Sequence, residues 1–243
     1  MTYIISELSN QWGGSLQQLK SYILQSSIFG ADAVKIQLFG DDWNVKRLNK
    51  NGNDYLSINR DDYQKLSSFS ENHGIELFAS PFDKERLNWC LDNEDSTIKI
   101  GYGVYRDRRE IANLAVESGK KVIISLDPSK EDICIPPYGS NKNVLYLLTS
   151  RKYPTLLSEI DIPENFKKSI FHGYSDHCPG IAACLLAISR GADIIEKHFT
   201  QSTAWQKIGE MAHTGAMENS DLKLLRKLER EIRLVMNKNF TSF

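Results

Sequence analysis

Residues 172–200, HGYSDHCPGIAACLLAISRGADIIEKHFT, decide how the rest of the chain is interpreted. The apolar runs at 169–173 and 193–196 are typical of buried parallel strands, and the apolar segment 180–189 between them predicts a helix. A polar cluster that contains a histidine follows each run, with His177 after the first and His198 after the second. In an α/β barrel, the C-terminal ends of parallel strands carry the chemistry, so we expect both imidazoles at one mouth.

Two imidazoles that come from neighbouring strands can converge on a single divalent metal ion. Imidazole suits several transition metals, and geometry decides among them. The spacing by itself leaves a second interpretation open, in which His177 and His198 are both structural.

Length and composition limit the class of protein. The chain has 243 residues, a length compatible with one α/β barrel domain, and its formal charge of −1 gives no basic field for nucleic acid or membrane. It contains no apolar run long enough to span a bilayer, and its first residues lack a basic leader and a cleavage site. Because Cys90, Cys134, Cys178 and Cys184 have no CxxC spacing, we expect reduced thiols and a cytoplasmic protein.

Several motifs resemble those of the sialic acid synthase (N-acetylneuraminate synthase) family. GYSDH at 173–177 and EKHFT at 196–200 resemble its paired signature, and GADAVKIQ at 30–37 and SPFD at 80–83 are also similar to family segments. The resemblance implies a (β/α)₈ TIM barrel that condenses phosphoenolpyruvate with a sugar aldehyde to give a 3-deoxy-ulosonic acid. It also implies a divalent metal, Mn²⁺ or Mg²⁺, held by His177 and His198.

Strands are expected near 3–7, 32–38, 75–79, 97–101, 121–125, 144–148, 169–173 and 193–197. Helices are expected at 15–29, 59–73, 84–92, 107–118, 180–189 and 220–236. The stretch 127–139 contains Pro128, Pro136, Pro137 and Gly139, which break helices, so helix five of the barrel should be reduced to about one turn or missing. A homodimer contact or a partner subunit could cover the wall there.

The resemblance also implies site residues. The candidates for catalysis are Glu7, Lys35, Lys99, Asp176 and Glu210. The candidates for substrate binding are Gln37, Ser80, Ser125, Ser150, Tyr153 and Ser175. A lysine inside an apolar strand, such as Lys35, needs a partner or a function, whereas Glu7 and Glu210 could equally be exposed carboxylates. Asp176 could orient an imidazole or a metal-bound water, or favour the dipole of the following helix.

The chain departs from the family at several positions. Tyr102 stands where the family usually has serine, Val104 where it has an acidic residue, and Leu147 where histidine is common. In the 201–217 loop, Glu210 and His213 are alternatives for a family aspartate. The family normally continues into a small antifreeze-protein-like domain, and we expect residues 1–243 to form a single barrel without it.

Three functions remain open from the sequence. The first is the metal-dependent condensation of phosphoenolpyruvate with a sugar aldehyde. The second is a barrel that keeps the pocket but no longer condenses and acts as a binding or regulatory subunit, which the changes at Tyr102 and Val104 would favour. The third is a barrel aldolase or lyase with a different reaction.

Overall fold

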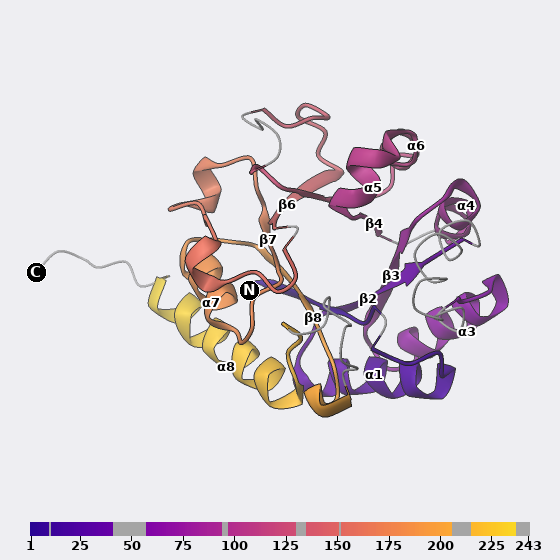
Figure 1. The fold of residues 1–243 in the computed structure, drawn as a ribbon, viewed down its shortest axis with the longest axis horizontal. Helices are drawn as coiled ribbons and strands as arrows, with labels where there is room; N and C mark the ends of the chain where they lie inside the picture. The colour runs from indigo at the N-terminus through magenta and orange to yellow at the C-terminus, as the bar shows by residue number, and fades with distance from the viewer. Residues whose placement is uncertain are drawn as a thin grey trace, which may run out of the picture.

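Eight parallel strands close into a barrel in the computed structural model, in the order in which they occur along the chain (Figure 1). The structure describes residues 1–9, 11–40, 57–93, 97–129, 135–150, 152–205 and 215–236. The strands are β1 Tyr3–Glu7, β2 Ala33–Leu38, β3 Glu76–Pro81, β4 Ile98–Ile100, β5 Val122–Leu126, β6 Val144–Thr149, β7 Gly173–Asp176 and β8 Ile194–His198. The chain therefore folds as the TIM barrel that its motifs predicted.

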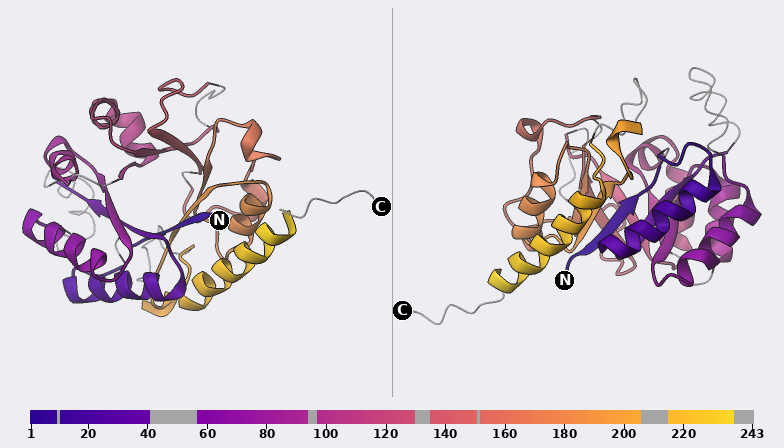
Figure 2. Two further views of the ribbon diagram at one scale, coloured as in Figure 1. Left: turned by 180° about the vertical axis from the view of Figure 1, so that it is seen from behind. Right: turned by 90° about the horizontal axis from the view of Figure 1, so that it is seen from below.

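Helices surround the barrel and run beside its strands (Figure 2). They are α1 Leu16–Phe29, α3 Arg60–Glu71, α4 Lys84–Asp92, α5 Tyr102–Asp107, α6 Arg109–Glu117, α7 Ala182–Ser189 and α8 Asn219–Met236. The Ser15 hydroxyl caps the start of α1 by accepting a hydrogen bond from Gln18 N. Among the described residues, no helix combines the length and apolar character needed to cross a bilayer.

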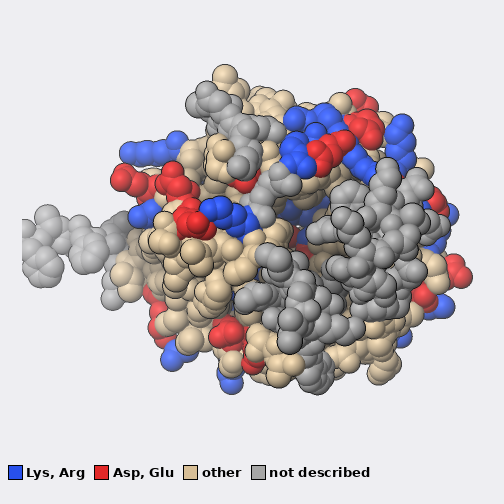
Figure 3. Space-filling view, in the orientation of Figure 1, with Lys and Arg blue, Asp and Glu red and all other residues tan. Residues whose placement is uncertain are grey.

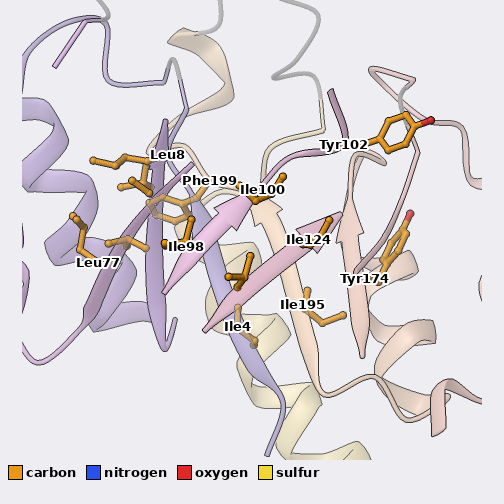
Figure 4. Packing of buried hydrophobic residues seen from close by; sticks show 14 of the residues in the cluster. Ile4, Leu8, Leu77, Ile98, Ile100, Tyr102, Ile124, Tyr174, Ile195 and Phe199 are labelled. Carbon is orange, nitrogen blue, oxygen red and sulfur yellow. The ribbon is translucent and has the colours of Figure 1, made fainter. Parts of the chain in front are cut away.

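The core has two layers because side chains alternate across each strand. Outward-facing residues such as Ile4, Ile124 and Ile195 pack in the large cluster between the strands and the helices (Figure 4). Inward-facing residues form a smaller apolar cluster inside the barrel, which consists of Ile5, Ala33, Phe78, Ile123, Leu147 and Ile194. Two residues further along β1, β2, β3, β5 and β8, the next inward-facing side chains are Glu7, Lys35, Ser80, Ser125 and Glu196. The apolar cluster thus forms the floor of a polar pocket.

The seventh strand was predicted wrongly. It begins at Gly173 and continues to Asp176, whereas residues 169–172 lie before it. Ser169 is instead part of a local turn, where its hydroxyl accepts from Phe171 N and donates to Phe166 O. The polar sequence GYSD is a strand because β6 and β8 pair with it on both sides, so the tertiary context overrides the apolar pattern.

The region after β4 also differs from the prediction. The expected helix at 107–118 is α6, and a short additional helix, α5, begins at Tyr102 directly after the strand. The described residues between β5 and β6, 127–129 and 135–143, contain no helix, as predicted. Tyr138 covers part of this wall: its backbone N–H donates to the Tyr146 hydroxyl at 3.0 Å, and its own hydroxyl donates to Asn113 on α6 at 2.7 Å.

A buried ionic network ties α8 to the start of the barrel. Glu229 is fully buried, accepts from Thr2 N at 2.6 Å and pairs with Arg226 at 3.1 Å. Arg226 also binds Asp32 and donates to the backbone oxygens of Thr2 and Gly30. These contacts join the C-terminal helix to β1 and to the turn before β2.

Replacing Glu229 with glutamine should lower the free energy of unfolding by about 1.5 kcal/mol, because the hydrogen bonds lose their charge assistance while the shape is kept. The matched control is Glu231→Gln, which alters an exposed pair with Lys227 on the same helix and should change stability by less than about 0.5 kcal/mol. Urea denaturation of the two variants compares them directly. Equal effects would contradict a role for the buried network.

Candidate active site

A single pocket at the C-terminal mouth of the barrel brings together the predicted site residues. Its volume is about 400 Å³. The predicted residues that line it are Glu7, Lys35, Gln37, Ser80, Lys99, Ser125, Ser150, Tyr153, Ser175, Asp176, His177 and His198. The space-filling view shows basic side chains within the hollow on this face (Figure 3). Glu210 and the alternative His213 lie outside the described residues.

Two lysines converge on one glutamate at the bottom of the pocket. Lys35 from β2 and Lys99 from β4 lie 3.2 Å and 3.4 Å from the carboxylate oxygens of Glu196 on β8. Lys35 also pairs with Glu7, which lies opposite it in the β1–β2 register. Glu196 was not among the predicted site residues. Its position two residues before His198, in a strand whose alternate residues face inward, was the signal that could have identified it.

Burial dominates the electrostatics of this cluster. It lowers the pKa of Lys35 to about 8, although Glu196 counteracts part of the effect, and it also lowers the pKa of Lys99. Burial alone would raise the pKa of Glu196, but the two lysines outweigh it and hold that pKa at about 2. The glutamate therefore stays ionised between two cations, which are fixed in a site with little water.

Hydroxyl groups surround the two lysines. Lys99 Nζ donates to Ser125 Oγ at 2.7 Å, and Ser175 donates to Glu196. Ser80 Oγ is buried and has no hydrogen-bond partner among the described residues. A buried hydroxyl without a partner costs free energy, so this group is suited to donate to a bound ligand.

The two histidines face each other across the mouth. Their ring centroids are 5.6 Å apart, and the Tyr153 ring packs on His177 with a centroid distance of 3.9 Å. His177 Nδ1 lies 2.6 Å from the carbonyl oxygen of Ser150, and since that oxygen can only accept, Nδ1 carries the proton. Burial lowers the pKa of His177 to about 4. His177 is therefore neutral with an unprotonated Nε2, the form that binds a metal.

The donor set fits a divalent ion that keeps open coordination positions. No cluster of three or more His, Cys, Asp or Glu side chains with metal-binding geometry occurs in the described part of the chain. The protein would thus supply two imidazole nitrogens, and oxygen atoms of substrate or water would complete the shell. Ser150, predicted to bind substrate, acts on this site through the backbone carbonyl that orients His177.

Asp176 binds donors on three different segments of the chain. Its carboxylate accepts from Lys197 Nζ at 2.6 Å, from Cys178 N at 2.9 Å and from the Cys184 thiol at 3.2 Å. None of these contacts is with an imidazole. The aspartate therefore holds the turn after β7 to β8 and α7, because a buried carboxylate binds the strongest donors within reach.

The backbone near His177 and His198 is closely packed at two glycines. A Cβ atom on Gly173 would lie 2.0 Å from the carbonyl oxygen of Ile194, so only glycine lets β7 approach β8 this closely. A Cβ atom on Gly215 would lie 2.6 Å from the carbonyl oxygen of His177. Met217 then continues with a hydrogen bond from its N–H to the His198 carbonyl oxygen. The segment from 215 to 217 thus packs on the backbone of both histidines.

Helix α5, which the sequence did not predict, provides part of the lining. Gly101, Tyr102, Gly103, Val104, Arg106 and Asp107 all border the pocket. Val104, which replaces the acidic residue of the resembled family, is buried there. The pocket wall after β4 is therefore apolar at Val104 and charged one helical turn later, at Asp107.

Comparison with known proteins identifies the family. A model of the NeuB family matches residues 22–240, which is most of the chain. The chain belongs to the NeuB family. This family assignment agrees with the motifs at 173–177 and 196–200.

The chain is also similar in sequence, at low identity, to individual synthases. The chain is 27% identical to the pseudaminic acid synthase of Campylobacter jejuni over 226 residues, covering 81% of this chain and 64% of that protein. It is 25% identical to the N,N'-diacetyllegionaminic acid synthase of Legionella pneumophila, covering 96% of this chain and 73% of that protein. The chain thus spans just under two thirds of the length of the first of these relatives.

A solved structure shares the fold. The sialic acid synthetase of Leptospira borgpetersenii superposes with a TM-score of 0.87 at 24% identity, covering 100% of this chain and 87% of that one. The two chains therefore share the same fold.

Proposed function

We propose that this chain condenses phosphoenolpyruvate with a sugar aldehyde to give a 3-deoxy-ulosonic acid. One observation carries the proposal: Lys35 and Lys99 converge beside buried hydroxyl groups in the same pocket as two facing histidines. The pocket thus combines an anion site with a site for a polarised carbonyl. Membership of the NeuB family and the similarity to named ulosonic acid synthases support the same reaction.

The lysines and serines would hold phosphoenolpyruvate. This substrate carries a phosphate and a carboxylate, and ammonium groups with oriented hydroxyls make strong, charge-assisted hydrogen bonds to such oxygens. Lys99 Nζ is hydrogen-bonded to Ser125 Oγ, and the Ser80 hydroxyl, which has no partner among the described residues, would donate to the substrate. The apolar floor below them excludes water, which strengthens these interactions.

The reaction then needs an aldehyde beside C3 of the enolpyruvate. C3 attacks the aldehyde carbon to form the new C–C bond, water adds at C2, and phosphate leaves with cleavage of the C–O bond. Glu7, which pairs with Lys35, would accept a proton from the attacking water. Gln37 and Tyr153 would contact the substrates from the wall of the pocket.

His177 and His198 would hold Mn²⁺ or Mg²⁺ at the mouth. When bound, the ion supplies Lewis-acid polarisation of the aldehyde carbonyl. The Ser150 carbonyl keeps His177 in the tautomer that such a ligand needs, and Tyr153 fixes the plane of its ring.

The decisive experiment is phosphate release from phosphoenolpyruvate with Mn²⁺ and a panel of aldoses. Condensation predicts release only when both an aldose and phosphoenolpyruvate are present, with a ulosonic acid detected by mass spectrometry. Turnover of a sugar without phosphoenolpyruvate would indicate an aldolase or lyase instead. Tight binding of phosphoenolpyruvate without turnover of any aldose would indicate a binding or regulatory barrel, the function that Val104 favours.

The affinity for phosphoenolpyruvate should fall as the pH rises through about 8. Burial lowers the pKa of Lys35 to about 8, so its ammonium form, which the anion needs, is present below that pH and lost above it. The phosphate itself titrates near pH 6 and stays dianionic over this window. Calorimetric titrations between about pH 7 and about pH 9.5 measure the effect. The affinity of the Lys35→Met variant for phosphoenolpyruvate should depend less on pH. If the affinity of the unmodified protein does not change over this pH range, the assignment of Lys35 is contradicted.

A further inference from the structure

Arg106 and Asp107 form an ion pair at the mouth of the pocket. Both line the pocket from α5, and the guanidinium binds the carboxylate of the neighbouring residue through two nitrogens. Arg106 also lies over the ring of Tyr102, with its Cζ atom 5.9 Å from the ring centroid. Asp107 is three residues after Val104, so both belong to one face of the helix.

The side chains of Arg106 and Asp107 are much more exposed to solvent than the lysines at the bottom of the pocket. The side chain of Lys99 is 1% exposed and that of Lys35 is 7% exposed, whereas Arg106 and Asp107 are 35% and 48% exposed. A substrate held by the lysines therefore lies deep in the barrel. A second substrate that reacts with it would extend outward toward the mouth, where α5 forms part of the pocket wall.

The charges that line the pocket limit which second substrates it can bind. The charged side chains of the described lining balance: Lys35, Lys99, Arg106 and Lys197 oppose Glu7, Asp107, Asp176 and Glu196. Each of the four cations has a carboxylate partner. Phosphoenolpyruvate already adds a phosphate and a carboxylate to this neutral lining. A phosphate on the second substrate would meet the Asp107 carboxylate, whereas a hydroxyl can donate to Asp107 and accept from Arg106 at the same time.

We propose that Arg106 and Asp107 are the specificity-determining pair for the acceptor, and that the acceptor is an uncharged, polyhydroxylated aldehyde rather than a phosphorylated one. The inference rests on the proposed function and deepens it, because it assigns the distal part of the acceptor to α5. Arg106 lowers the pKa of Asp107 through their hydrogen bond, so the carboxylate is ionised and acts as a hydrogen-bond acceptor.

Alditols test the pair without requiring turnover, since they lack the aldehyde. The probes are mannitol, arabinitol and N-acetylmannosaminitol, each compared with its terminal phosphate ester, in calorimetric titrations with phosphoenolpyruvate and Mn²⁺ present. We expect at least one neutral alditol to bind about tenfold more tightly than its phosphate ester. Asp107→Asn should weaken the neutral alditol about tenfold, the scale of one charged hydrogen bond. It should also improve the phosphate ester, because the Arg106 fork then binds phosphate.

The control is Glu110→Gln, an exposed carboxylate on α6 that does not line the pocket. It should leave every affinity unchanged. The proposal is overturned if phosphate esters bind the unmodified protein as tightly as the neutral alditols, if Asp107→Asn changes no alditol affinity, or if no alditol binds. The affinity for phosphoenolpyruvate alone, measured separately, should be the same in Asp107→Asn. If the unmodified protein does not bind phosphoenolpyruvate at all, the proposed function is refuted. If it binds phosphoenolpyruvate but the alditol results fail, only the assignment of Arg106 and Asp107 is refuted.

Discussion

Replacing His177 and His198 together by alanine should abolish the loading of a divalent metal ion. The two imidazoles lie 5.6 Å apart between ring centroids, and no cluster of three or more metal-binding side chains occurs among the described residues. Each single variant should bind the metal more weakly, since one protein ligand remains. The measurement is elemental analysis of protein that has been treated with a chelator, reloaded with Mn²⁺ and freed of excess ion.

A histidine outside the pocket provides the control for this experiment. His73 follows α3, and its Nδ1 contacts the carbonyl oxygen of Phe69. His73→Gln should therefore load as much Mn²⁺ as the unmodified protein. Stoichiometric Mn²⁺ in the double alanine variant, with an unchanged circular dichroism spectrum, would show that the two histidines are structural.

Lys35→Met should weaken phosphoenolpyruvate binding by ~1.5–3 kcal/mol or more, the scale of hydrogen bonds to charged groups. This corresponds to a loss of about tenfold or more in affinity. The substitution also leaves Glu7 without its cation and removes one of the two cations from Glu196. Breaking a buried pair in this way costs about 3–5 kcal/mol of stability. Calorimetry gives the affinity, and urea denaturation gives the stability.

A second substitution separates these two effects. Lys35→Met combined with Glu7→Gln neutralises the carboxylate that lost its partner, and a glutamine oxygen can still accept from Ser9 N. The double variant should regain part of the stability and none of the affinity. Unchanged affinity in Lys35→Met would remove this lysine from the anion site, and affinity restored by Glu7→Gln would show that the loss came from misfolding.

Much of the site was predictable because its residues come from strands with a simple period. The inward face of β8 contains Ile194, Glu196 and His198 at every second position, and that of β2 contains Ala33, Lys35 and Gln37. Once the register of parallel strands is known, these side chains must meet at one mouth. The lysines, serines and histidines predicted from the motifs therefore line one pocket.

Other parts depended on contacts that sequence patterns do not contain. Asp176 stands next to His177 in the chain, yet its carboxylate binds Lys197, which comes from the neighbouring strand. The strand at 173–176 is polar and became a strand only through pairing on both sides. The strand period places Glu196 on the inward face, but its pairing with Lys35 and Lys99 depends on two strands that are distant in the sequence.

The sequence by itself predicted the barrel and predicted that two histidines and two lysines lie on its strands or just after them, because alternation along a strand and the ends of strands are local properties of the chain. The tertiary structure alone decided which charges pair and how deep each lies. The partners of Glu196, Asp176 and Asp107 show this difference. Asp107 pairs with its neighbour in the chain and lies at the mouth, whereas the other two are buried with cations that come from other strands. Burial and long-range pairing depend on closure of the barrel, which brings β8 back to β1 and which no local pattern encodes.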